Sequence, residues 1–182
     1  MSIRILLDER GIADALRRIA GDIAAAVPAS ARIALIGIRS RGDLLARRLV
    51  PLLATEARTA GESRDGDPLL GTLDITLYRD DLAEIGPSAV VRTTDVPFDV
   101  AGTLVFLIDD VIFTGRSIRA ALDAVIDLGR PQAIRLAVLV DRGGRELPIQ
   151  PDIVGVRAPD PREHVRVLLT ESDGVDRVEV AP

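Results

Sequence analysis

The chain of 182 residues contains no cysteine and no tryptophan, and aromatic residues make up only 2% of it. Without cysteine, neither a disulfide framework nor a thiolate zinc site can form. The shortage of aromatic side chains excludes RNA binding through stacking platforms, on which most single-strand RNA modules depend. No apolar run approaches the ~18 residues of a membrane span, and the opening MSIRILLDERG lacks the apolar core of a signal peptide. We therefore expect a cytoplasmic protein.

Lysine is also absent: all 23 basic residues are arginine, and the net charge is −5. Such uniform use of arginine, beside abundant alanine, glycine, proline and aspartate, indicates a GC-rich coding sequence. A single arginine is therefore a weaker sign of selected bidentate chemistry than it would be in an average protein. The negative net charge argues against broad, non-specific binding to nucleic acid and leaves room only for a local basic patch.

Helical patterns alternate along the chain with β-branched apolar runs. Apolar residues at helical spacing predict helices over about 12–27, 42–53 and 118–128. Continuous apolar runs predict buried strands at Arg32–Ile38, Thr103–Ile108 and Ala133–Val140. A further strand is predicted at Gly71–Tyr78, and shorter candidates lie at Ile153–Val156, Val165–Leu169 and Val178–Val180. Fully apolar strands that alternate with helices predict an α/β fold with a doubly wound, mainly parallel sheet, in a single domain over residues 1–182.

Three polar segments follow predicted strands directly: RSRG after the first, DDVIFTGRS after the third and DRGG after the fourth. Ligands of doubly wound sheets bind beyond the carboxyl ends of the strands, so these segments should meet at one ligand site. The polar stretch from Arg79 to about Asp99 is too long for an ordinary connector and suits a mobile functional loop.

The segment VFLIDDVIFTGRS, residues 105–117, combines a strand, two carboxylates and a turn that opens a helix. The free backbone N–H groups of a first helical turn bind anions, and Gly115 allows close approach of a phosphate. Asp109 and Asp110 would repel that phosphate but suit sugar hydroxyls and the hydration shell of Mg²⁺. A ribose 5-phosphate meets both requirements. Competing phosphate motifs fail, because Asp43 stands where a Walker A loop requires lysine and no G-x-G-x-x-G follows a strand.

This segment resembles the 13-residue phosphoribosyl pyrophosphate (PRPP) motif of type I phosphoribosyltransferases. The strings GIRSRG, LDITLYRDDL, DLGRP and VDRGGRELPIQPDIVG occur around it in the order seen in the PyrR family, whose members regulate the pyrimidine operon and act as uracil phosphoribosyltransferases. The resemblance covers nearly the whole chain. It implies conversion of uracil and PRPP to UMP and pyrophosphate, at a PRPP site made of Asp109, Asp110, Val111, Ile112, Phe113, Thr114, Gly115, Arg116 and Ser117.

The resemblance also implies which residues act on the reaction. Asp109 and Asp110 would hold the ribose, and Arg79 would close over the pyrophosphate with its loop. Ser40 and Arg41 would lie in the pyrophosphate loop, where the family usually has threonine at position 40. Such transfer passes through an oxocarbenium-like transition state, so catalysis would come from positioning and from stabilising the departing pyrophosphate.

Further expectations concern the base, the metal and the assembly. Residues from about 141 to 182 would form a small hood over the base, with Arg142 and the backbone near Val165 as pyrimidine contacts. Mg²⁺ would arrive with PRPP, held chiefly by substrate oxygens and water, so no protein metal ligand is expected. Family members assemble as homodimers or larger oligomers, and we expect the same here.

PyrR proteins can also bind a stem-loop in the leader of pyrimidine mRNA in response to UMP, and the resemblance suggests Arg17, Arg18 and Arg145 as contacts. The chain departs from the family pattern in the same segments, with Arg17 for threonine, Gly21 and Gly144 for histidine, Gln150 for arginine and Val156 for lysine. Because the substrate motifs are intact, this pattern favours an enzyme with weakened or altered RNA binding. Two alternatives stay open: a non-catalytic RNA-binding regulator that senses the nucleotide, and a phosphoribosyltransferase for another base, such as a purine.

Overall fold

The computed structural model describes residues 3–28, 30–59, 67–79 and 93–182. Its main sheet has the strand order β3-β2-β4-β5-β6, and all neighbouring strands run parallel. The strands are β2 (Ile33–Ile38), β3 (Leu69–Leu73), β4 (Leu104–Ile112), β5 (Ala133–Asp141) and β6 (Ile153–Arg157). This arrangement confirms the predicted α/β fold with a mainly parallel sheet.

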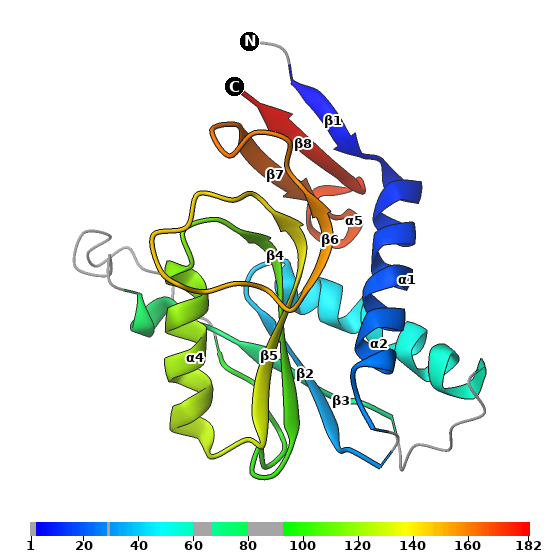
Figure 1. The fold of residues 1–182 in the computed structure, drawn as a ribbon, viewed down its shortest axis with the longest axis vertical. Coiled ribbons are helices and arrows are strands. Elements are labelled where there is room, and N and C mark those ends of the chain that lie inside the picture. The colour runs from blue at the N-terminus through cyan, green and yellow to red at the C-terminus, as the bar shows by residue number, and fades with distance from the viewer. Residues whose placement is uncertain (1–2, 29, 60–66, 80–92) are drawn as a thin grey trace.

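Helices cover both faces of the main sheet (Figure 1). On one face, α1 (Glu9–Ala25) and α2 (Gly42–Thr59) pack against a cluster that includes Phe106. On the other face, α4 (Arg116–Leu128) packs against a second cluster that includes Ile118. Since both faces are covered, β2 is buried at every residue, which explains its continuous apolar run. No helix in the described ranges is long and apolar enough to cross a membrane.

A second, antiparallel sheet has the order β1-β8-β7 and lies beyond the end of the main sheet at which β4 ends (Figure 1). Its strands are β1 (Arg4–Leu7), β7 (His164–Leu168) and β8 (Arg177–Ala181), and α5 (Thr170–Asp173) joins the last two. The sequence did not predict β1, a short strand whose partner lies at the other end of the chain. The segment expected as a hood is divided, because β6 pairs with β5 and so belongs to the main sheet.

The predicted strand Gly71–Tyr78 is wrong in its second half. β3 ends at Leu73 because the Asp74 carboxylate accepts hydrogen bonds from the backbone N–H and the hydroxyl of Thr76, at 2.9 and 2.6 Å. Such a turn folds the chain into the short 3₁₀ helix η1, Thr76–Tyr78. Of the long polar stretch predicted to follow, residues 80–92 lie outside the described ranges.

The predicted strand Thr103–Ile108 is longer in the structure, where β4 continues to Ile112. The extension exists because β5 pairs with β4 as far as Ile112 opposite Asp141. Asp109 and Asp110 therefore lie within the last four residues of β4, not in the loop that follows it.

Candidate active site

The RSRG segment after β2 lies directly against the end of β4. A methyl group on Gly42 would come within 2.4 Å of the Ile108 carbonyl oxygen and 3.1 Å of the Asp109 Cα. Only glycine permits so close an approach of two backbone segments. This contact places the predicted pyrophosphate loop, with Ser40 and Arg41, next to the predicted ribose site.

Arg41 connects this loop to two carboxylates. Its backbone has φ 79°, a left-handed conformation that is uncommon for a residue with a side chain and that concentrates at functional sites, and the preceding Arg39–Ser40 peptide bond is cis. The Arg41 Nη2 donates to both carboxylate oxygens of Asp173, at 3.0 and 3.3 Å. Its positive charge also opposes the rise in the pKa of Asp110 that burial causes. The structure therefore brings one predicted pyrophosphate residue and one predicted ribose residue together.

The Asp109–Asp110 pair is held at the end of β4 by backbone hydrogen bonds. Asp109 is 6% exposed, and its Oδ1 accepts from the N–H of Asp110 at 3.0 Å; the Asp110 Oδ1 accepts from the N–H of Val111 at 2.9 Å. Burial raises the pKa of Asp109 well above its ordinary value, and the charge of Asp110 adds to the rise. Burial also raises the pKa of Asp110, against the opposing effects of the Val111 N–H and of Arg41. A ligand that donates hydrogen bonds would favour the ionised form of both groups.

The turn between β4 and α4 forms a cavity of about 150 Å³, lined by Val111, Ile112, Phe113, Thr114, Gly115, Ser117 and Ile118. Gly115 has φ 92° and is the N-cap of α4, where it offers no side chain to the N–H groups of the first turn; the Thr114 hydroxyl accepts from the Arg116 N–H at 3.4 Å. The lining includes this first turn, so the cavity has the donors and the helix dipole that favour a phosphate. Arg116 does not line the cavity and pairs with Glu146 at 2.7 Å.

Arg142, predicted to contact the pyrimidine, lies beside the PRPP motif. Its guanidinium stacks on the Phe113 ring, 3.8 Å from the centroid, and the backbone N–H of Arg142 donates to the Ile112 carbonyl at 3.0 Å. Gly144 also touches this ring: its φ is 71°, and a methyl group there would lie 2.4 Å from a ring carbon. Phe113 is 38% exposed, so the stacked pair forms an apolar and cationic surface that a planar base can reach.

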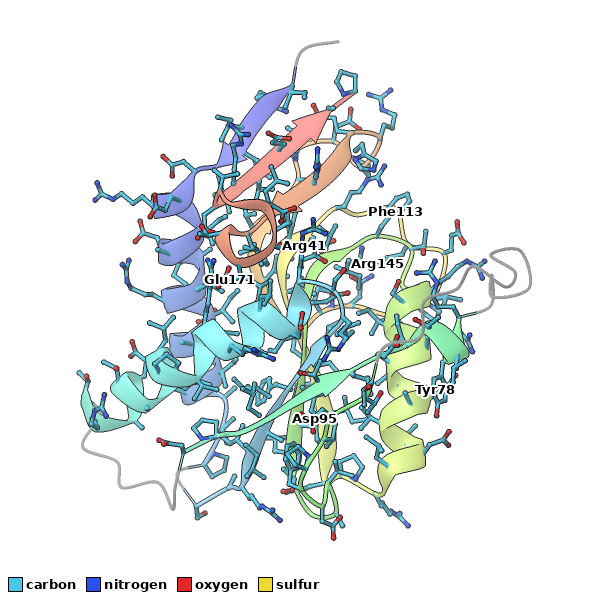
Figure 2. The ribbon with its side chains drawn as sticks, turned by 180° about the vertical axis from the view of Figure 1, so that it is seen from behind. Arg41, Tyr78, Asp95, Phe113, Arg145 and Glu171 are labelled. Carbon is cyan, nitrogen blue, oxygen red and sulfur yellow. The ribbon has the colours of Figure 1, made fainter. Side chains whose placement is uncertain are left out.

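Arg145 holds the loop after β5 against the PRPP motif. It donates to the Asp141 carboxylate at 2.7 Å, to the Phe113 carbonyl at 2.9 Å and to the Ile149 carbonyl at 2.9 Å. Figure 2 shows Arg41, Phe113 and Arg145 at the same end of the main sheet. The Arg145 side chain is only 12% exposed to solvent, and these contacts hold its guanidinium inside the site. They give Arg145 a structural role, and its role as an RNA contact stays a prediction.

Arg17 and Arg18 lie elsewhere, exposed on α1. Arg17 forms an ion pair with Asp14, and Arg18 donates to the Gly155 carbonyl on β6 at 2.9 Å. The surface beside them has room at Gly21, where an added methyl group would meet nothing within 4 Å. Arg17 and Arg18 are therefore both exposed on α1, whereas Arg145 lies in the loop after β5; RNA binding by the three stays a prediction.

Val165 is buried in β7, where its side chain belongs to the first core cluster. β7 is an edge strand of the second sheet, so alternate backbone groups face away from β8. The contact between this backbone and a pyrimidine stays a prediction.

Arg79 is exposed and follows η1, which is fixed to α4. The Tyr78 hydroxyl donates to Asp127 at 2.8 Å, and Arg119 donates to the Tyr78 carbonyl at 3.2 Å. Arg119 lies near the start of α4, the helix whose first turn lines the cavity. Arg79 directly follows Tyr78, which Arg119 binds, so Arg79 begins its loop next to this helix. Its role over the pyrophosphate stays a prediction.

Sequence reasoning named Asp141 only as part of the DRGG segment and missed Asp173. Asp141 had a signal, because it directly follows a predicted strand at the edge where ligands bind. Asp173 had none: it lies in a short acidic turn before Gly174, a pattern typical of any exposed loop.

Comparison with known proteins gives the class and the family. The phosphoribosyl transferase domain family matches residues 2–171. Among solved structures, the hypoxanthine phosphoribosyltransferase of Trypanosoma cruzi superposes with a TM-score of 0.71 at 17% identity, covering 97% of this chain and 95% of that one. The enzyme of Leishmania tarentolae in complex with GMP gives 0.67 at 18% identity, covering 97% and 95%. Fold and domain match together define a type I phosphoribosyltransferase.

Two relatives with higher sequence identity have the same name. The bifunctional protein PyrR of Pelotomaculum thermopropionicum is 51% identical over 175 residues, which cover 95% of this chain and 92% of that protein. The bifunctional protein PyrR of Thermus aquaticus is 53% identical over 167 residues, which cover 91% and 88%. The chain belongs to the PyrR family of phosphoribosyltransferases.

Proposed function

We propose that this chain is a cytoplasmic uracil phosphoribosyltransferase, which converts uracil and PRPP to UMP and pyrophosphate. The observation that carries the proposal is the meeting of three parts at the end of β4. They are the Asp109–Asp110 pair, the cavity at the start of α4 and the loop that carries Arg41. Each part suits one portion of PRPP: the ribose hydroxyls, the 5-phosphate and the pyrophosphate.

In this arrangement the 5-phosphate accepts hydrogen bonds from the first turn of α4, and the 2- and 3-hydroxyls donate to Asp109 and Asp110. The C1–oxygen bond then faces the Arg41 loop. As the bond breaks, its electron pair leaves with the pyrophosphate, and the ring nitrogen N1 of uracil attacks C1 from the opposite side. The proton that N1 loses as the new bond forms leaves with the pyrophosphate. Carboxylates near the ribose stabilise its developing positive charge, while Arg41 and Arg79 stabilise the negative charge that departs.

Magnesium enters this scheme with the substrate. The carboxylates of Asp109 and Asp110 suit the hydration shell of a Mg²⁺ ion, which binds few protein ligands and keeps most of its waters and substrate oxygens. Within the described residues, no group of three or more acidic or histidine side chains is placed to hold a metal ion. Bound Mg²⁺ would supply neutralising charge for the phosphates, and the protein residues would orient the ribose.

The base would bind between the Arg142–Phe113 pair and the second sheet. We assign the hood to β7 and β8 together with β1, since these strands form one sheet beyond the end of β4. Transfer to a purine is the alternative for this site. Incubation of the protein with PRPP, Mg²⁺ and radiolabelled uracil, hypoxanthine or guanine tests both: label should enter UMP alone. Label in IMP or GMP with none in UMP would contradict the assignment of uracil.

A second function, UMP-dependent binding to the leader mRNA of pyrimidine genes, is supported by the name of the relatives and by the exposed Arg17 and Arg18. The substitutions at Gly21, Gln150 and Val156 argue that this binding is weak or altered. A gel-shift assay with the leader RNA of the source organism, with and without UMP, tests it. Tight binding combined with no turnover would favour a non-catalytic regulator.

We expect a homodimer or larger oligomer, which sedimentation equilibrium would measure.

A further inference from the structure

The short turn between β7 and β8 faces the arginines at the start of α2. Asp173 accepts from the Arg41 Nη2 at 3.0 Å, from the Leu169 N–H at 3.0 Å and from the Ser172 hydroxyl at 2.6 Å. In the same turn, Glu171 accepts from the Nε of Arg48 at 2.8 Å. Figure 2 shows Arg41 beside the helix that carries Glu171. The segment between β7 and β8 is thus joined to the pyrophosphate loop by Asp173 and to α2 by Glu171 and Asp176, which both bind Arg48.

Asp173 is a carboxylate at every pH of interest. The Ser172 hydroxyl, the Leu169 N–H and Arg41 lower its pKa to about 2. Its negative charge therefore offsets the positive charge of Arg41 in the free protein. Within the described structure, the Arg41 Nε is buried and has no hydrogen-bond partner, so the guanidinium is held through Nη2 alone. An anion that binds the Nη2 group of Arg41 must therefore compete with Asp173 for it.

We propose that Asp173 is a positioning residue that competes with pyrophosphate for Arg41 and so limits the affinity of the site for pyrophosphate. The proposal rests on the proposed function, because it takes the Arg41 loop as the pyrophosphate site. During turnover, Arg41 exchanges its carboxylate partner for the pyrophosphate and returns to Asp173 when the product leaves. Asp173 thereby aids product release at the expense of PRPP affinity.

Removal of the Asp173 charge has two effects of opposite sign. In Asp173→Asn the single amide oxygen can take the place of Oδ2 and accept from the Leu169 N–H, so the turn is kept. The NH2 group then takes the place of Oδ1 and cannot accept from Arg41, so the 3.0 Å contact with the guanidinium is lost. The loss of one negative charge near a pyrophosphate that carries two or more favours binding, on the order of tenfold after allowance for the partial exposure of the pair. Tighter binding is therefore expected, whereas a residue that only stabilised the turn would give weaker binding.

The test is calorimetric titration of the whole protein with magnesium pyrophosphate and, separately, with UMP. Asp173→Asn should lower the Kd for pyrophosphate by roughly tenfold and leave the Kd for UMP unchanged, since UMP has no pyrophosphate group. Glu171→Gln is the matched control: it removes a carboxylate from the same turn but one that binds Arg48, and it should change neither Kd. In an Arg41→Ala background, Asp173→Asn should have no further effect on pyrophosphate.

The kinetic counterpart is a lower KM for PRPP and stronger product inhibition by pyrophosphate in Asp173→Asn, with the KM for uracil unchanged. Weaker or unaltered pyrophosphate binding in a folded Asp173→Asn variant would overturn the proposal, as would an equal gain in Glu171→Gln. Absence of pyrophosphate binding in the wild type would also overturn it. Because titration needs no turnover, a protein that fails to use uracil but shows the predicted shift would refute the proposed function and leave the competition for Arg41 standing.

Discussion

The double substitution Asp109→Asn and Asp110→Asn should remove activity and raise stability at the same time. The side chains keep their shape, and each asparagine oxygen can still accept the backbone N–H that the carboxylate accepts, at 3.0 Å from Asp110 N and 2.9 Å from Val111 N. What disappears is the pair of charges that would receive two ribose hydroxyls. Hydrogen bonds to charged groups contribute about 1.5–3 kcal/mol each, so kcat/KM with PRPP should fall by roughly 10²–10⁴-fold.

The stability gain follows from the raised pKa of Asp109. Its pKa in the folded protein lies above the ordinary value of 3.8, because burial disfavours the charge. At pH below 3.8 both the folded and the unfolded chain hold the proton, and the group costs nothing. As the pH rises toward and through the folded pKa, only the unfolded chain releases its proton freely, so the folded state loses stability. An asparagine has no proton to lose, and the variant should be more stable than the wild type at neutral pH but not at pH 3.

Thermal unfolding at pH 7.5 and pH 3 measures the second effect, and initial rates over a range of PRPP concentrations measure the first. A gain of about 1 kcal/mol would raise Tm by roughly 2–4 °C in a chain of this length. If the variant were instead less stable at neutral pH yet fully active in its folded fraction, the carboxylates would be structural residues. The assignment of the ribose site would then be wrong.

Three more outcomes are expected. Arg79→Ala should lower kcat by roughly 10²-fold with an unchanged Kd for UMP, because the contact forms mainly as pyrophosphate departs; equal losses of both would place Arg79 elsewhere. Arg145→Ala should destabilise the fold by about 3 kcal/mol in chemical denaturation, since it leaves Asp141 half-buried without its partner; a change under about 0.5 kcal/mol would return Arg145 to the surface residues. Compared with typical PyrR proteins, this chain should bind a family stem-loop more weakly and with a shallower salt dependence in gel shifts, because about two cations per protomer are missing; tight, UMP-stimulated binding would show a different RNA surface.

Restoring the family residues is informative only where the backbone allows it. Gln150→Arg lies at an exposed position and should recover part of any lost RNA affinity without affecting activity. Gly144→His is different, because its φ of 71° and its 2.4 Å approach to Phe113 make any side chain strained at this position. A combined restoration that includes position 144 would therefore disturb the Arg142–Phe113 pair and the active site with it.

The main sheet and its helices could be predicted because each strand is a continuous apolar run and each helix a periodic one. The run at β2, for example, is buried at every residue, as its composition requires. The PRPP segment could be placed for a similar reason: a strand, two carboxylates and a helix start follow each other within 13 residues.

Features that depend on distant residues could not be predicted. β1 is short, and its pairing with β8 joins the two ends of the chain. β4 passes its predicted end because β5 continues beside it, which no local pattern indicates. The role of Arg145 depends on acceptors at Asp141, Phe113 and Ile149 that meet only in the folded loop. The Arg41–Asp173 ion pair joins residues 132 positions apart, and only the fold brings them together.

The most direct test of the site and its function is transfer of radiolabelled uracil to UMP, measured with PRPP and Mg²⁺ for the wild type and for the Asp109→Asn, Asp110→Asn variant. The site described at the end of β4 predicts UMP formation by the wild type that saturates with PRPP and falls by at least about 10²-fold in the variant. Undiminished UMP formation by the variant, or none by a folded wild type, would contradict it.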